Sequence, residues 1–438
     1  MKFILKNTSA VDLFAFLAII LLPWQARWIL AYRTIDGQPY EYGTIGIYAG
    51  SVVVVAAIFL LWHSRQAHPR MTWPAKVFFG WLLLSSLFAN DAVLALWNLG
   101  LAVIAFGYFV IASSWERAKV IGALIAAGVA QAVIAWLQFI DQRVIASTFL
   151  GVAEHTPWVL GQSVVIIHGQ RILRAYGLLP HPNMLAGILA VSLMLVVYRF
   201  IRNERLDPAV RSQAVRQKLE VLFLLLLSAL LITFSRSALV SVLVIGFGWF
   251  AVALATGRLP QIRGLGRLFL LGLLLFLVFT SIAGGIWLER FGIVPVSGEQ
   301  RRLETLSTSE RLLSFHEAEV VLKPRTLGIG LGLGSFVPAL AEAIPRLPVY
   351  VYQPVHAVPI MALLEIGVLG TAFLIWFLYS LLPKGIIRRG AHDILKLYPV
   401  SLVAVLLVIG LFDHYLWTSY FGQSLWWVVF GAAVSRTS

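Results

Sequence analysis

Long apolar runs separated by short polar intervals extend along most of the chain. A helix that crosses a bilayer needs about 20 predominantly apolar residues, and several of the runs are near the lower limit of this length. The pattern predicts an all-α polytopic membrane protein with about twelve transmembrane helices. The runs lie at residues 10–31, 44–62, 74–89, 92–113, 118–139, 184–201, 219–234, 237–256, 267–287, 356–382, 397–412 and 415–434.

Composition supports a membrane protein and excludes an ordinary soluble one. Hydrophobic residues make up 60% of the chain and charged residues only 12%, whereas soluble domains carry about 25% charged residues. Cysteine is absent, which excludes disulfides and thiolate metal sites. The first apolar run is followed by Trp24 and Arg27 rather than by small residues, so we expect a retained span and not a cleaved signal peptide.

The placement of positive charge predicts the orientation of the spans. With twelve spans, 21 of the 34 Lys and Arg residues fall on the side of the N-terminus, and seven of the other 13 lie in the long loop 288–355. By the positive-inside rule, both termini are then cytoplasmic and the long loop is external. The net charge of +14 thus reflects membrane orientation, and we expect no nucleic-acid partner.

The chain is predicted to form a single multipass membrane domain, residues 1–438, with three notable polar segments. Residues 140–183 and 288–355 are expected to be external loops, and the second to form part of an active site. Residues 202–218 are a basic stretch expected on the cytoplasmic side, near anionic lipid headgroups.

The external loop 288–355 contains two local patterns. The spacing of Ser307 and Glu310 matches a capping box, and apolar residues follow at helical spacing until Pro324. This predicts an amphipathic surface helix with Arg311 in its first turn. The glycine run 328–334 has no GxGxxG or Walker A pattern. It indicates either a tight re-entrant turn with close backbone packing or an amide-lined niche for an anion.

Three external arginines, Arg174, Arg236 and Arg311, are candidates for anion binding. Arg236 lies in the very short turn between two spans, where it either snorkels to the interface or faces a cavity. An arginine placed like Arg311 is, by itself, more often a solvated charge on a surface helix. Together the three favour a phosphate clamp, since a guanidinium matches phosphate oxygens bidentately and keeps its charge.

His356, at the start of an apolar run, is either a structural residue or a general base, because its ordinary pKa is near neutrality. His181, between two prolines, is a turn residue or an acceptor-binding group. Glu365 is expected to pair with an arginine, orient a neighbour or face the bundle interior. The external segments contain no HExxH, CxxC or Asp-x-Asp pattern, so we expect no metal, no cofactor and no metal-dependent transfer.

At these residues the chain resembles the O-antigen ligase and O-antigen polymerase family of membrane glycosyltransferases. The resemblance covers about residues 170–380, and four blocks match in order. They are Arg174-Ala-Tyr-Gly-Leu-Leu-Pro-His-Pro-Asn183; Thr233-Phe-Ser-Arg-Ser237; Ser309-Glu-Arg-Leu-Leu-Ser-Phe315 followed by Leu327-Gly-Ile-Gly-Leu-Gly; and His356 with Leu364-Glu-Ile-Gly-Val-Leu-Gly370.

The resemblance implies a fold like the GT-C type and an inverting, metal-independent glycosyl transfer on the external face of the bacterial cytoplasmic membrane. The implied donor is a glycan on undecaprenyl pyrophosphate. Arg236 and Arg311 would hold the pyrophosphate, Arg174 would assist or bind glycan, and His356 would activate the acceptor hydroxyl. Two positions depart from the family pattern: Ala357 follows the histidine where a polar residue such as Asn is common, and Phe315 stands where Trp is frequent.

Several functions remain compatible with this pattern. The expected one is ligation of glycan to a sugar of lipid A-core, and the alternatives within the family are polysaccharide polymerisation and protein O-glycosylation. A flippase of lipid-linked glycans would need ionisable residues at mid-membrane. Here Glu365 is the main such residue, while the other polar groups gather at one face, which favours an interfacial enzyme.

Overall fold

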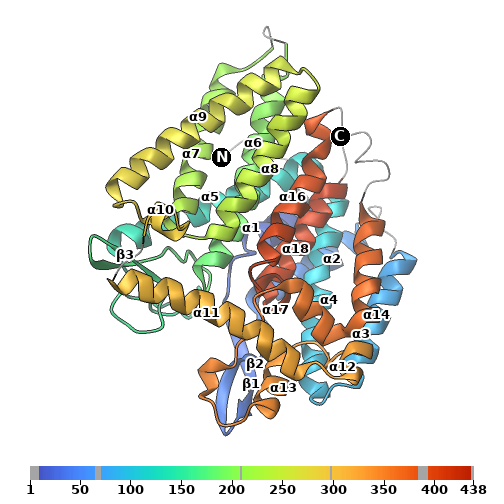
Figure 1. Ribbon diagram of the computed structural model, residues 1–438. Helices are drawn as coiled ribbons and strands as arrows, with labels where there is room; N and C mark the ends of the chain where they lie inside the picture. Colours follow the sequence, from blue (N-terminus) through green and yellow to red (C-terminus); the bar gives the residue numbers. More distant parts are fainter. Residues whose placement is uncertain (1–8, 65–70, 208–209, 296–297, 383–392, 436–438) are drawn as a thin grey trace.

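The computed structural model describes residues 9–64, 71–207, 210–295, 298–382 and 393–435. Within them the chain is mainly helical, with two small antiparallel hairpins (Figure 1). The N-terminal half contains α1 (Ala10–Ile20), β1 (Arg27–Ile35), β2 (Gln38–Tyr48), α2 (Ala49–His63), α3 (Trp73–Leu87), α4 (Ala92–Ser114), α5 (Arg117–Asp141), β3 (Val164–Ile167), β4 (Gln170–Leu173) and α6 (Pro182–Glu204).

The second half continues with helices that alternate between the bundle and one of its ends. They are α7 (Gln213–Ile232), α8 (Arg236–Ala255), α9 (Leu259–Ile282), α10 (Ile286–Arg290), α11 (Gly298–Val321), α12 (Pro324–Gly328), α13 (Phe336–Ala343), a 3-10 turn η1 (Val349–Val351), α14 (Val358–Leu381), α16 (Ile394–Gly410), α17 (Tyr415–Thr418) and α18 (Tyr420–Val434).

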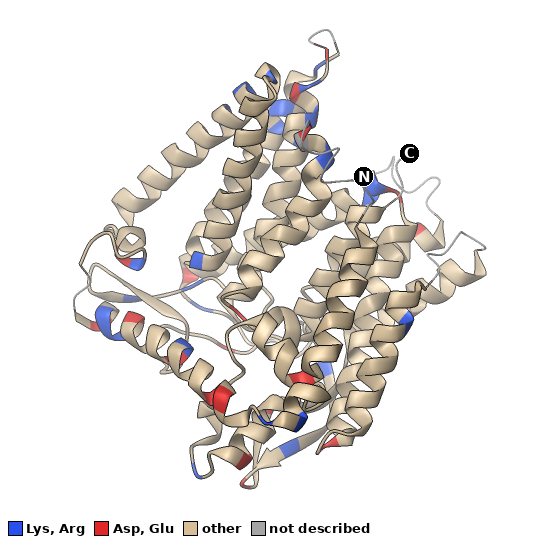
Figure 2. Ribbon diagram, turned by 45° about the vertical axis from the view of Figure 1, so that its right-hand side comes forward, with Lys and Arg blue, Asp and Glu red and all other residues tan. Residues whose placement is uncertain are grey.

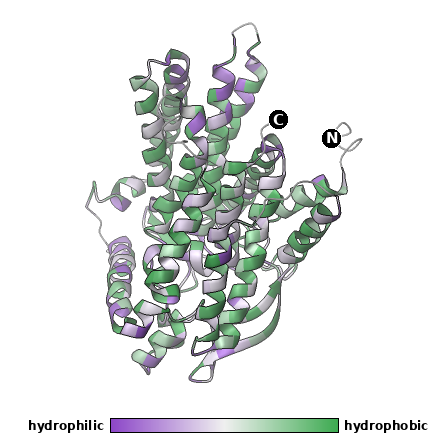
Figure 3. Ribbon diagram, turned by 90° about the vertical axis from the view of Figure 1, so that its right-hand side faces the viewer, coloured by the Kyte–Doolittle hydropathy of each residue, from purple (hydrophilic) through white to green (hydrophobic). Residues whose placement is uncertain are grey.

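Six of the described helices are long and apolar enough to cross a membrane: α4, α5, α6, α8, α9 and α14. Hydrophobic residues predominate along the bundle helices (Figure 3). The most apolar stretch of α6 is 94% buried and that of α9 only 11%. Helix α6 is therefore the centre of the bundle, packed against α5, α7 and α16, whereas α9 presents apolar side chains outward, as a lipid-facing helix does.

Each predicted apolar run contains a helix, but the first two runs were wrong in extent. Helix α1 ends at Ile20, and residues 27–48 form the β1–β2 hairpin. Its turn residues Asp36 and Gly37 have φ of 51° and 76°. Asp-Gly is a strong hairpin signal because both central residues of a type I′ turn need positive φ. The signal was missed because residues 27–31 and 44–48 of the strands were counted within the first two apolar runs. Twelve membrane crossings remain a prediction.

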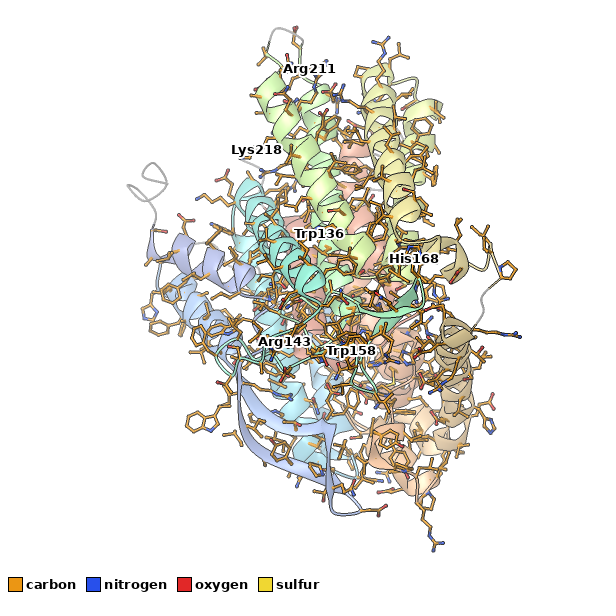
Figure 4. All side chains as sticks on the ribbon, turned by 90° about the vertical axis from the view of Figure 1, so that its left-hand side faces the viewer. Trp136, Arg143, Trp158, His168, Arg211 and Lys218 are labelled. Carbon is orange, nitrogen blue, oxygen red and sulfur yellow. The ribbon has the colours of Figure 1, made fainter. Side chains whose placement is uncertain are left out.

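The two ends of the bundle differ in character. Arg211 and Lys218, from the basic 202–218 segment, lie toward one end, and Arg143 and Trp158 lie beyond Trp136 toward the other (Figure 4). Helices α11 and α13 and the β1–β2 hairpin also gather at this second end, called the α11 end below (Figures 1 and 2). Eight of the 21 basic residues counted for orientation lie outside the described residues: Lys2, Lys6, Arg65, Arg70, Lys384, Arg388, Arg389 and Arg436.

Candidate active site at the α11 end

The glycine run packs against a break in α14. Gly367 interrupts that helix with φ 69° and ψ 179°, which leaves carbonyls without intrahelical partners. The amides of Leu331 and Gly332 donate to Leu364 O at 3.0 Å and Glu365 O at 2.9 Å. Gly330 has φ +88°, and a Cβ there would lie 2.3 Å from Glu365 O. The run thus makes the close backbone packing that was one of the two predicted alternatives.

The carboxylate of Glu365 receives hydrogen bonds from the beginning of α13. It is buried, accepts from the amide of Phe336 at 3.3 Å, and accepts from Trp417 Nε1 at 2.8 Å. No arginine is paired with it among the described residues. Glu365 therefore joins α13, α14 and α17, and its carboxyl group already serves as an acceptor for the nearby amide of Phe336.

Arg174 lies buried at the end of β4 and holds two neighbouring segments. Its Nε donates to Thr233 O at 2.7 Å, and its terminal nitrogen donates to Asn183 Oδ1 at 2.8 Å. The amide nitrogen of Asn183 donates in turn to Asp413 Oδ2 at 2.7 Å. Burial, then the charge of Arg290, lowers the pKa of Arg174 to about 9, so its guanidinium still carries a positive charge at neutral pH.

Arg236 begins α8 directly after the turn at Phe234, whose φ is 51°. Its guanidinium contacts Glu304 Oε2 at 2.9 Å and donates to Arg290 O at 3.0 Å. A terminal guanidinium nitrogen of Arg290 lies 2.6 Å from Oε1, the other carboxylate oxygen of Glu304. One carboxylate therefore balances two guanidiniums, and the group keeps a net positive charge.

Arg311 lies near the middle of α11. The prediction that it lies in the first turn of a helix was therefore wrong. Helix α11 starts at Gly298, because the polar stretch before Ser307 is rich in good helix formers. Ser307 is consequently an interior residue and caps nothing. Among the described residues, no hydrogen bond or ion pair engages the Arg311 side chain. Burial, then repulsion from Arg236, lowers its pKa, while Asp413 and Glu304 act in the opposite direction.

His356 lies just before α14, whose N-cap is Ala357. Its Nδ1 is buried and has no hydrogen-bond partner within the described residues. Burial, opposed by Asp413 and reinforced by Arg311, lowers the pKa of His356, so the ring is neutral at neutral pH. Its ring centroid lies 5.0 Å from that of His414.

His181 is the N-cap of α6, which favours the predicted turn role. Its Nδ1 accepts from the amide of Asn183 at 3.1 Å, and Nε2 lies 3.1 Å from Ser163 Oγ. Burial, followed by the charge of Arg174, lowers the pKa of His181. A neutral ring is what a capping acceptor requires.

Four residues that contact or act on the predicted site residues were not singled out from the sequence: Arg290, Glu304, Asp413 and His414. A usable signal existed for Asp413 and His414, since they form a charged break between the last two apolar runs on the side predicted to be external. Arg290 and Glu304 had none, because both sit in a loop that contains many other charged residues.

Three potential metal ligands also lie together. His356, Asp413 and His414 each offer a donor atom, and these atoms lie within 4.8 Å of one another. The predicted absence of metal did not anticipate this group. Its neighbours are cationic, since Arg311 acts electrostatically on both His356 and Asp413, and positive neighbours disfavour a bound cation.

Comparison with known proteins finds a match for one part of the chain. Residues 221–375 match the family model described as O-antigen ligase. This match supports an O-antigen ligase domain in that part of the chain. Searching curated proteins gives no match. The O-antigen ligase domain includes Arg236, Arg311, His356 and Glu365, while the residues that complete the cluster from outside it are Arg174, His181, Asn183, Asp413 and His414.

Proposed function

We propose that this O-antigen ligase family member transfers a glycan from undecaprenyl pyrophosphate to a hydroxyl of lipid A-core sugar. The observation that carries the proposal is the shared environment of Arg174, Arg236 and Arg311 beside a neutral His356. Guanidiniums suit a pyrophosphate, and a buried imidazole nitrogen without a partner suits a general base.

In the proposed reaction, His356 takes the proton of the acceptor hydroxyl while the hydroxyl oxygen attacks the anomeric carbon of the donor. The bond from that carbon to the pyrophosphate oxygen breaks, and the configuration inverts. Negative charge develops on the departing undecaprenyl pyrophosphate. Arg236 and Arg311 stabilise it electrostatically, with Arg174 assisting, and such preorganised charge is often the largest single catalytic contribution.

The orientation belongs to the same proposal. Both termini and the 202–218 segment would be cytoplasmic, and the α11 end would face the periplasm, with about twelve spans in the cytoplasmic membrane. In Figure 4, Arg211 and Lys218 of the 202–218 segment lie at the opposite end from Arg143 and Trp158 of the 140–183 segment, as this arrangement requires.

Polysaccharide polymerisation and protein O-glycosylation use the same donor and differ only in the acceptor. A flippase is the candidate from another class. The main ionisable residue within a long span, Glu365, is engaged by Phe336 and Trp417. The site has its charged groups at one end instead of midway along the bundle, and this favours the transferase.

The test is reconstitution of the full-length protein in proteoliposomes with a polyprenyl-pyrophosphate glycan and a lipid A-core acceptor. His356→Ala and Arg236→Ala should reduce transfer by at least roughly a hundredfold, as removal of a general base or a charge-stabilising donor does. His316→Ala and Arg301→Ala, exposed positions on α11, are matched controls. Full transfer by folded His356→Ala and Arg236→Ala proteins would contradict the proposed site.

A further inference from the structure

A cavity at the α11 end is chemically different from the group of Arg174, Arg236 and Arg311. It has a volume of about 360 Å³ and lies between the β1–β2 hairpin, the turn at Asn90 and Asp91, and α13. Figure 1 shows the hairpin and α13 at the α11 end. Small-molecule sites are typically about 300–1,000 Å³, so the cavity is large enough for a ligand.

The cavity combines an exposed aromatic ring with fixed polar groups. Tyr32 lines it and is 52% exposed. Arg33 and Asp91 form a two-point ion pair, with Nε to Oδ2 at 2.8 Å and a terminal nitrogen to Oδ1 at 2.9 Å. A pyranose has an apolar C–H face that stacks on aromatic rings, and hydroxyls that bond to planar polar groups. This lining therefore suits a sugar.

Ser335 supplies an independent observation. Its side chain is 4% exposed, lines the cavity, and its Oγ has no hydrogen-bond partner within the described residues. Ser335 is the N-cap of α13, yet the hydroxyl makes no capping bond. A buried hydroxyl without a partner carries a desolvation penalty, and a ligand hydroxyl in the cavity would remove it.

The charge of the cavity separates it from the proposed donor site. Arg33 is neutralised by Asp91, and Glu342 adds a further carboxylate to the lining. A pyrophosphate would be repelled here and attracted to the arginines. The occupant expected from this lining is an uncharged, hydroxyl-rich group.

Strand β2 connects the cavity to the neighbourhood of the proposed base, because His414 lies beside both Tyr42 and His356. Tyr40 lines the cavity, and Tyr42, two residues along β2, places its ring centroid 6.0 Å from that of His414. Two residues of chain span at most about 7 Å. A smaller cavity is lined by Tyr42, Gly334 and Thr418. A saccharide in the larger cavity would thus lie on the side of β2 that leads, through Tyr42 and His414, toward His356.

We propose that the cavity lined by Tyr32, Arg33, Asp91, Ser335 and Glu342 binds a neutral sugar of the acceptor glycan. The cavity is then the acceptor subsite, distinct from the arginine cluster. The inference of acceptor use rests on the proposed function, whereas saccharide binding by the cavity can be measured without it.

The first experiment measures binding by saturation-transfer NMR, with detergent-solubilised full-length protein and the uncharged core hexasaccharide fraction released from a lipopolysaccharide. Tyr32→Ala, Ser335→Ala and Glu342→Gln should each weaken binding about fivefold or more. Glu41→Gln, an exposed residue next to Tyr40 on β2, is the control and should bind as wild type. Absence of binding to wild type, or equal binding by all variants, would overturn the proposal.

The second experiment measures transfer with acceptor and donor varied separately. The same variants should raise the KM for acceptor about fivefold and leave the KM for donor within twofold. A rise in donor KM alone would overturn the acceptor assignment. If the wild type transfers nothing, the proposed function fails, and the binding experiment alone decides whether the cavity is a saccharide site.

Discussion

Asn183 Nδ2 donates a hydrogen bond to Asp413 Oδ2 at 2.7 Å, although the two residues are 230 positions apart. The same amide accepts from Arg174. This single side chain therefore links an arginine of the proposed donor site to the carboxylate beside His356, and it joins the beginning of α6 to the segment between α16 and α17.

Asn183→Ala should destabilise the protein by about 1–3 kcal/mol, because it leaves buried groups of Arg174 and Asp413 without partners. The thermal midpoint in detergent should fall and transfer should drop with it. Ser192→Ala on the same helix is the control, since its hydroxyl only donates to Leu124 O and its loss should cost less than about 1 kcal/mol. Equal midpoints for Asn183→Ala and wild type would contradict the linking role.

The pH profile should report His356 in its neutral form. Burial, opposed by Asp413 and reinforced by Arg311, lowers the pKa of this ring below its usual 6.5, so kcat/KM should be flat near neutrality and fall only when the pH drops below 6.5. Arg311→Ala removes a charge that lowers this pKa, so the acid limb should move upward by roughly half a unit to one unit. The position of the limb, not its height, is the readout.

An acid limb that stays in place in Arg311→Ala would show that the two side chains do not interact. His316→Ala should leave both the limb and the rate unchanged, because that residue is exposed on α11.

Glu304→Gln should strengthen pyrophosphate binding. Glu304 contacts Arg236 at 2.9 Å and Arg290 at 2.6 Å, and so partly neutralises the arginines before a phosphate arrives. Its removal should lower the Kd for inorganic pyrophosphate roughly fivefold, or about 1 kcal/mol, and also lower the thermal midpoint without ligand. Titration calorimetry measures the first effect. Weaker binding in the variant would mean that Glu304 positions the guanidiniums instead.

Gly330→Ala should be among the most damaging substitutions outside the charged residues. The added Cβ would lie 2.3 Å from Glu365 O at a position with φ +88°, so the loop or the break in α14 must move, at a cost of roughly 1–3 kcal/mol or more. Gly328→Ala is matched to it, since that Cβ meets nothing within 4 Å. Similar midpoints for the two variants would contradict the close packing of loop and helix.

Chelation should leave transfer unchanged within about twofold. The donor atoms of His356, Asp413 and His414 lie within 4.8 Å of one another, but Arg311 acts on this group and disfavours a cation. The measurement is the rate after dialysis against EDTA, compared with the rate after metal is restored. A loss that one divalent ion reverses would make this group a metal site.

The sequence by itself determined the class of the protein and much of the proposed site. Apolar runs of helix length and scarce charge require a helical membrane protein. The short turn before Arg236 and the proline before α14 placed Arg236 and His356 at helix starts, because these signals are local. The hairpin signal at Asp36 and Gly37 was equally local, but parts of both strands were counted within the first two apolar runs.

Only the tertiary structure decided which residues meet. Asp413 joins Asn183, Glu304 joins Arg236 to Arg290, and the glycine run fills a break at Gly367. Each contact depends on how separate helices pack, and helix packing is not encoded in any single stretch of chain. The start of α11 at Gly298, in contrast, follows from the good helix formers before Ser307 and was available from the sequence.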